Sequence, residues 1–82
     1  IIGLKVSGLN DREGVKIISI ENGSTAQQNG LLKDDVIVKI GRISITTVEQ
    51  YNKIMESKES GDVIMLKIER NGSQTIFAFS IQ

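Results

Sequence analysis

The sequence predicts a small, mostly β domain with two helices, arranged as a partly open antiparallel barrel of five to six strands. The apolar residues are dominated by 14 Ile and 6 Val, against 5 Leu and 2 Ala, and β-branched side chains favour strands. Polar and Gly-containing turns divide the chain into short apolar runs. Asn71-Gly72 lies between two alternating runs, which is typical of a β-hairpin. With 82 residues the chain is interpreted as a single domain over residues 1–82.

The first half predicts two strands, a short helix and a third strand. Alternation predicts strands over residues 4–9 and 15–20, separated by a polar turn. Ser24 is expected to cap a helix over residues 25–29, which ends at Gly30. Leu31 and Leu32 are expected to pack the end of this helix onto the core. The next strand covers residues 36–40.

The second half predicts a brief strand over residues 43–45, a helix over 47–57, and strands over 63–70 and 74–81. Thr46 or Thr47 is the expected cap of this helix, with Glu49 or Gln50 completing a capping box. The order of elements is therefore ββαββαββ, which suits a small barrel with helices over its openings. The residues expected at the centre of the core are Ile17, Ile37, Ile40 and Ile68.

Composition excludes several classes of function for this chain by itself. There is no His and no Cys, so the usual catalytic triads, zinc sites and disulfide frameworks cannot be built. We therefore expect no enzyme activity, no cofactor and no metal in this chain. Ten basic residues balance ten acidic ones, which argues against nucleic-acid binding. Asp34-Asp35 favours a turn over a calcium site, because no further spaced oxygen ligands accompany it.

Several motifs resemble a PDZ domain of the bacterial kind. The central run from Gly23 to Ile37, Gly-Ser-Thr-Ala-Gln-Gln-Asn-Gly-Leu-Leu-Lys-Asp-Asp-Val-Ile, is similar to the family pattern of Gly-Ser-Pro-Ala, Ala-Gly-Leu and Gly-Asp-Val-Ile. Ile2-Gly3-Leu4 matches the apolar-Gly-apolar element that opens such domains. The resemblance covers essentially the whole chain and is closest to the second, C-terminal PDZ domain of HtrA/Deg serine proteases. Asp34 replaces a common Gly and is therefore expected to adopt a positive φ.

The resemblance implies a peptide-binding groove between one strand and one helix. A ligand would add as a strand to an exposed sheet edge, with its C-terminal carboxylate held by backbone amides. Tyr51 and Ile54 would then point to the core. The residues implied for peptide binding are Ile2, Gly3, Leu4, Lys5, Val6, Val48, Asn52 and Met55.

Two classes of function follow from the resemblance. The first is a module that binds C-termini or extended segments of substrate proteins for an HtrA/Deg-like protease of the periplasm or cell envelope. The second is an assembly domain that contacts other subunits of the parent protease. A PDZ domain of another processing protease or of a site-2 protease is a third interpretation. Because the chain begins with Ile, we expect it to be excised from a longer protein, and the resemblance implies that this parent is a serine endopeptidase.

Overall fold

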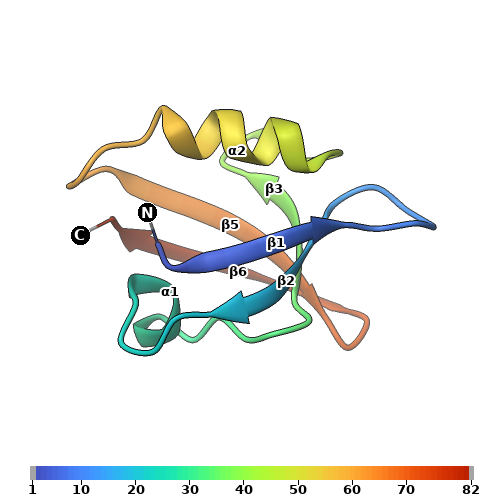
Figure 1. Cartoon of the computed structure of the whole chain (residues 1–82), viewed down its shortest axis with the longest axis horizontal. Coiled ribbons are helices and arrows are strands. Elements are labelled where there is room, and N and C mark those ends of the chain that lie inside the picture. Colours follow the sequence, from blue (N-terminus) through green and yellow to red (C-terminus); the bar gives the residue numbers. More distant parts are fainter. Residues whose placement is uncertain (1, 82) are drawn as a thin grey trace.

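The order of helices and strands matches the order expected from the sequence. The computed structural model describes residues 2–81 and contains eight elements (Figure 1). They are β1 (Leu4–Gly8), β2 (Val15–Ile20), α1 (Thr25–Gln28), β3 (Val36–Ile40), β4 (Ile43–Ser44), α2 (Val48–Glu56), β5 (Val63–Arg70) and β6 (Ser73–Ser80). Within residues 2–81, no helix is long and apolar enough to cross a membrane.

All strand pairs are antiparallel, and the sheet runs in the order β1-β2-β3-β5-β6, with β4 paired to β3. No pairing joins β1 to β6 within the described residues, so the barrel is open, as expected. Figure 1 shows α2 over one open side and α1 at the opposite side. The two ends of the sheet therefore leave β1 with one edge that carries no neighbouring strand.

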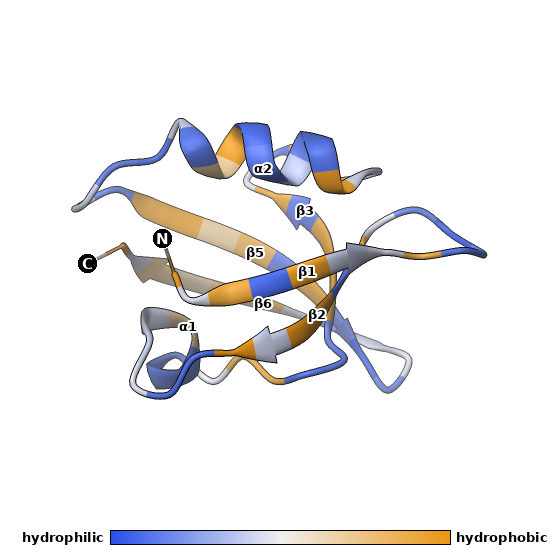
Figure 2. Cartoon of the chain, viewed as in Figure 1, coloured by the Kyte–Doolittle hydropathy of each residue, from blue (hydrophilic) through white to orange (hydrophobic). Residues whose placement is uncertain are grey.

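The interior is filled by β-branched side chains from the central strands. The four residues expected at its centre are all buried there, with Ile17, Ile37 and Ile68 fully enclosed and Ile40 nearly so. Figure 2 shows the alternation of apolar and polar residues along β1 and the striped surface of α2. This alternation places one face of each strand in the core.

The β5–β6 hairpin closes through the turn that the sequence predicted. Asn71 and Gly72 have φ values of 52° and 80°, and Arg70 pairs directly with Ser73 across the turn. Positive φ at both loop residues is the geometry that Asn-Gly favours in a two-residue hairpin. β6 begins at Ser73, one residue earlier than expected.

The helix caps agree with the sequence, but one packing expectation was wrong. Ser24 and Thr47 are the N-caps, and their hydroxyls accept from the amides of Gln27 and Gln50. The side-chain oxygen of Gln50 accepts hydrogen bonds from the backbone amide and from the hydroxyl of Thr46. α1 ends at Gln28, with Asn29 as its C-cap.

The packing error concerns the segment after α1. Leu31 is buried, whereas the Leu32 side chain is 53% exposed. Only one of the two leucines therefore packs the helix end onto the core. Asp34 adopts a φ of 75°, which confirms the expected left-handed turn. This turn leads the chain back into the sheet beside Leu31, with Leu32 on the solvent side.

Asp35 forms a buried ion pair that the sequence did not reveal. It is 2% exposed, and Arg70 donates to both of its carboxylate oxygens at 2.8 and 2.7 Å. The Leu32 amide donates to the same carboxylate, and Arg70 also bonds the Gly30 carbonyl oxygen. The Phe77 ring lies 5.5 Å from the guanidinium. This cluster ties the turn before β3 to the β5–β6 hairpin.

Candidate functional site

The unpaired edge of β1 faces α2. β1 pairs with β2 along one side, and α2 is the helix that contacts it. The Cγ2 atom of Val48 lies 3.9 Å from the place that a Cβ on Gly8 would take, whereas Met55 shares a hollow with Leu4. The start of α2 thus lies beside the end of β1, and the two elements run antiparallel. A strand edge and a helix together form a groove here.

At the start of β1, two backbone amides point away from α1 and β2. The Ile2 carbonyl accepts from the Ala26 amide at 3.0 Å, and the Gly3 carbonyl accepts from the Glu21 amide at 2.9 Å. The bonds are trans, so the N–H of the following residue points the opposite way in each plane. The amides of Gly3 and Leu4 are consequently directed away from α1 and β2. Two successive amides of this kind make a small anion-binding concavity.

Gly3 is required by both conformation and space. Its φ is 85°, and a Cβ at this residue would lie 2.3 Å from the Ser24 Cβ. The N-cap of α1 therefore packs directly behind the loop. The resemblance placed Gly3 among the residues implied for peptide binding, and the structure adds that the space behind Gly3 is already filled by Ser24.

A hollow of about 220 Å³ lies between the start of β1 and the C-terminal half of α2. Ile2 and Met55 are buried and Leu4 is half-buried, which makes the floor apolar. The exposed side chains of Asn52 and Glu56 line its mouth. The hollow therefore has an apolar floor and polar groups at its rim.

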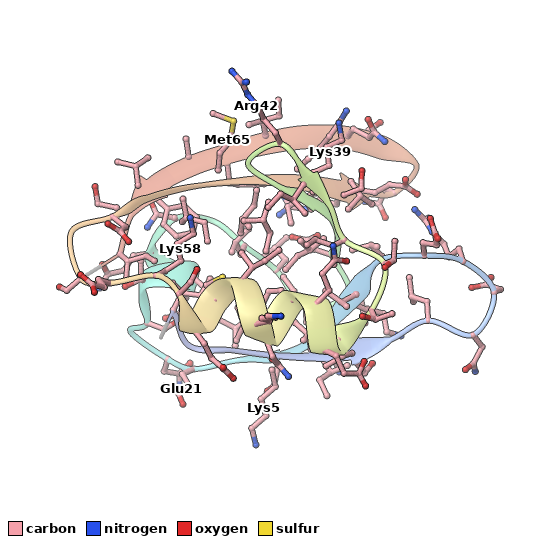
Figure 3. The ribbon with its side chains drawn as sticks, turned by 90° about the horizontal axis from the view of Figure 1, so that it is seen from above. Lys5, Glu21, Lys39, Arg42, Lys58 and Met65 are labelled. Atoms are coloured by element: carbon pink, nitrogen blue, oxygen red, sulfur yellow. The ribbon has the colours of Figure 1, made fainter. Side chains whose placement is uncertain are left out.

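The residues predicted from the sequence divide into three groups. Ile2, Leu4, Asn52 and Met55 line the hollow. Gly3 shapes the loop before β1 but does not line the hollow. Lys5 is exposed and points to solvent (Figure 3), whereas Val6 and Val48 pack against the core farther along the groove.

Two more residues line the hollow, although the sequence did not predict either of them there. Tyr51 was expected in the core and is 6% exposed, but its side chain also borders the hollow. Burial raises the pKa of Tyr51 to about 12. Glu56 was not among the residues implied for peptide binding. Its spacing of four residues from Asn52 places both on one helix face, and this signal was available in the sequence.

No set of three or more His, Cys, Asp or Glu side chains in residues 2–81 is grouped as metal ligands would be. Asp34 and Asp35 diverge: Asp34 is exposed, and Asp35 is buried against Arg70. The hollow and the two outward amides of the loop are the features from which a binding function is inferred. A strand edge, two outward amides and an apolar hollow in succession are features that receptors for added peptide strands combine.

The comparison with protein families agrees with this class. The family model for the PDZ domain matches residues 1–80, and the chain belongs to the PDZ domain family. Among curated proteins, it is 35% identical over 65 residues to the periplasmic pH-dependent serine endoprotease DegQ of Escherichia coli K12, covering 79% of this chain and 14% of DegQ. It is 32% identical over 77 residues to the periplasmic serine endoprotease DegP of the same organism, covering 94% of this chain and 16% of DegP.

A third relative belongs to another class of protease. The zinc metalloprotease RasP of Oceanobacillus iheyensis is 37% identical over 60 residues, covering 73% of this chain and 14% of RasP. The chain therefore spans about one seventh of the length of these relatives.

Solved structures share the fold. The HtrA3 PDZ domain bound to a phage-derived ligand (FGRWV) has a TM-score of 0.85 at 17% identity, covering 98% of this chain and 82% of that one. The HtrA-type protease AlgW with a decapeptide has a TM-score of 0.89 at 19% identity, covering 98% of this chain and 28% of that one. At these identities the likeness concerns the fold alone.

Proposed function

We propose that this domain binds peptides by adding them as a strand to the free edge of β1. The single observation that carries the proposal is the succession of an unpaired strand edge, two outward amides and an apolar hollow beside α2. A C-terminal carboxylate would accept hydrogen bonds from the Gly3 and Leu4 amides. Main-chain hydrogen bonds to β1 would supply affinity that does not depend on ligand sequence.

The terminal side chain of the ligand would enter the hollow. Its floor of Ile2, Leu4 and Met55 favours an apolar residue, because transfer of apolar surface from water is favourable by roughly 25 cal/mol per Å². Glu56 at the mouth carries a negative charge and disfavours an acidic residue next to the terminus. The preferred ligands are thus C-termini with Val, Leu or Phe last and no acidic neighbour.

We infer that the parent protein is an HtrA/Deg-like serine endoprotease of the periplasm, in which this domain presents substrate segments to a separate catalytic domain. The similarity to DegQ and DegP supports this inference. The similarity to RasP supports a second candidate, a PDZ domain of a zinc metalloprotease. In both cases the proposed role of the groove is the same.

The direct test is a titration of fluorescent hexapeptides ending in Val, Leu or Phe, each as the free acid and as the amide. We expect the free acids to bind at least about tenfold more tightly, because charge-assisted hydrogen bonds to the carboxylate are lost in the amide. In ¹⁵N-labelled protein, the Gly3 and Leu4 amide signals should shift most. Equal binding of acid and amide would contradict the proposed carboxylate site.

A pair of matched variants locates the ligand. Leu4→Glu places a charge in the hollow and should abolish binding of the free acids. Val63→Glu introduces the same group at a side chain that is 67% exposed on β5, away from the groove, and should leave binding unchanged. Circular dichroism of both variants checks that the fold is retained.

A further inference from the structure

The sheet presents a further surface on the side that faces away from the core. On β5 the side chains of Ile64, Leu66 and Ile68 are buried, so the alternate residues Val63, Met65 and Lys67 point outward. Figure 3 shows Lys39, Arg42 and Met65 projecting from the same side of the molecule. We call this surface the outer face; it consists of Lys39, Arg42, Val63, Met65, Lys67 and Ile76, with Ile43 at its edge, where it shares a hollow with Ile54 of α2.

The outer face collects most of the exposed large apolar side chains. Six such residues occur among residues 2–81, and four of them lie here, with exposures of 49% for Ile43, 67% for Val63, 48% for Met65 and 61% for Ile76. Ile43, Val63 and Met65 also border one hollow of about 380 Å³, together with Arg42. Single exposed apolar residues need no explanation, whereas a concentration of them marks a docking surface.

Among residues 2–81, three cations of this face lack an ion-pair partner, and the acidic Glu69, which the same alternation places on this face, is paired with Arg12. Lys39 on β3 is directly opposite Lys67 on β5, and like charges in this position repel and destabilise the sheet. Within residues 2–81, neither these lysines nor Arg42 forms an ion pair. Both lysines line a hollow that also includes Glu13 and Arg12, and Arg12 is paired with Glu69.

A Glu at residue 39 or 67 would convert this repulsion into a cross-strand ion pair. The chain instead keeps two cations facing each other, beside apolar side chains that are open to solvent. Local choices that cost stability are expected at functional sites, where another requirement outweighs them. An anionic partner with apolar groups satisfies both features, because it would neutralise the lysines and cover the aliphatic side chains.

We propose that the outer face is a second docking site, which takes an acidic protein segment carrying aliphatic side chains. Its carboxylates bind between Lys39 and Lys67, and its aliphatic side chains cover Met65, Val63 and Ile43. Met65 is two residues from Lys67 on β5, which is a separation of about 7 Å along a strand. Because the cationic and apolar parts of the face are this close, the acidic and aliphatic residues of the ligand must follow each other directly in its sequence. β1 and β5 are separated by β2 and β3 in the sheet, which keeps this site apart from the peptide groove.

The test uses an acetylated and amidated hexapeptide, Asp-Glu-Glu-Leu-Val-Leu, whose blocked C-terminus removes the carboxylate that the groove would bind. Titrated into the ¹⁵N-labelled domain, it should shift the amide signals of Lys39, Met65 and Lys67 rather than those of Gly3 and Leu4. Its affinity should fall as salt is raised from 50 to 500 mM, because exposed charges are screened. A peptide with Lys-Arg-Lys in place of the acidic residues should not bind.

Lys67→Glu is the decisive variant, because it separates binding from folding. It should raise the Tm by about 1–5 °C through the new ion pair with Lys39, while it weakens the acidic peptide at least about tenfold. Lys33→Glu makes the same charge change in the exposed loop after α1 and should leave the affinity unchanged. Binding of free-acid peptides in the groove should be equal in all three proteins.

Four results would overturn the proposal. They are shifts confined to the groove, equal loss of affinity in Lys67→Glu and Lys33→Glu, self-association of the domain that Lys67→Glu abolishes, and binding to anionic lipid vesicles without binding to the acidic peptide. The third result would assign the outer face to a second copy of the chain, and the fourth to a membrane surface.

Discussion

Gly3 is the residue at which the proposed carboxylate loop packs directly against the N-cap of α1. With φ at 85° and the Ser24 Cβ in the space of its own side chain, Gly3 tolerates no substitution without a shift of the backbone. Gly3→Ala should therefore destabilise the domain by about 2–5 kcal/mol, from left-handed strain plus overpacking. Urea unfolding followed by circular dichroism measures this.

Gly72→Ala is the matched control for this prediction. Gly72 also has a positive φ, of 80°, but no atom lies within 4 Å of an added Cβ. This variant should cost about 1–2 kcal/mol, from strain alone. Equal destabilisation by the two substitutions would show that contact with Ser24 contributes nothing.

The two ion pairs found among residues 2–81 are expected to differ in their contribution to stability. Arg70→Met leaves the Asp35 carboxylate, which is 2% exposed, with only the Leu32 amide as a donor. We expect a loss of about 2–4 kcal/mol, because a buried charge without its partner is costly.

Arg12 and Glu69 form the exposed pair, in which the hydrogen bond from Arg12 lowers the pKa of Glu69. Arg12→Met should leave the urea midpoint nearly unchanged, since exposed pairs are screened by solvent. Urea midpoints of both variants test the contrast. A smaller effect for Arg70→Met than for Arg12→Met would contradict the assigned role of Asp35.

At the scale of elements, Tyr51 and Met55 are the buried residues that fasten α2 to the sheet. Burial raises the pKa of Tyr51 to about 12, from 10.0 in the unfolded chain. The unfolded state therefore releases its proton first as pH rises. The stability that depends on the protonated form is complete below pH 10 and is lost between pH 10 and about pH 12.

This shift predicts a loss of about 2–3 kcal/mol at alkaline pH. Unfolding in urea at pH 8, 10 and 11.5 should show the decline in the native protein. Tyr51→Phe keeps the ring and removes the ionising group, so the stability of this variant should fall less over the same pH range than that of the native protein. Parallel declines in the two proteins would place the Tyr51 hydroxyl in solvent.

The sequence predicted the elements well wherever a local signal sets them. Asn71-Gly72 defines its hairpin through two positive φ angles, and Ser24 and Thr47 cap their helices through bonds within three residues. The expectation that Leu32 packs onto the core was wrong, because apolar character alone does not say which of two adjacent leucines faces the core. Burial of one or the other is decided by the left-handed turn at Asp34 that follows them.

The candidate site was only partly accessible from the sequence, for a physical reason. Ile2, Leu4, Asn52 and Met55 follow from the family pattern and line one hollow. The partners of Gly3 and Asp35 lie far along the chain, at Ser24 and Arg70. Contacts of this range are products of the whole fold, and no periodicity in the sequence reports them.

At the scale of the whole molecule, stability depends on one shared core under the open barrel. Ile37 on β3 is fully enclosed and pairs with both Val15 on β2 and Ile68 on β5. Removing its side chain beyond Cβ therefore opens a cavity that β2, β3 and β5 share, and these strands cannot collapse around it independently. The domain should unfold in one transition.

Ile37→Ala should cost about 2–5 kcal/mol, and Ile37→Val about 0.5–1.5 kcal/mol. Because a domain of this size is stabilised by only about 4–12 kcal/mol, the alanine variant can be largely unfolded, and the valine variant then supplies the measurable value. Ile18→Ala removes the same atoms from a side chain that is 41% exposed and should cost clearly less than Ile37→Ala. Urea unfolding monitored by circular dichroism and by peptide binding should give one midpoint for each variant, since the groove stands on the same core. A separate, earlier loss of peptide binding would show that α2 and β1 detach before the sheet unfolds.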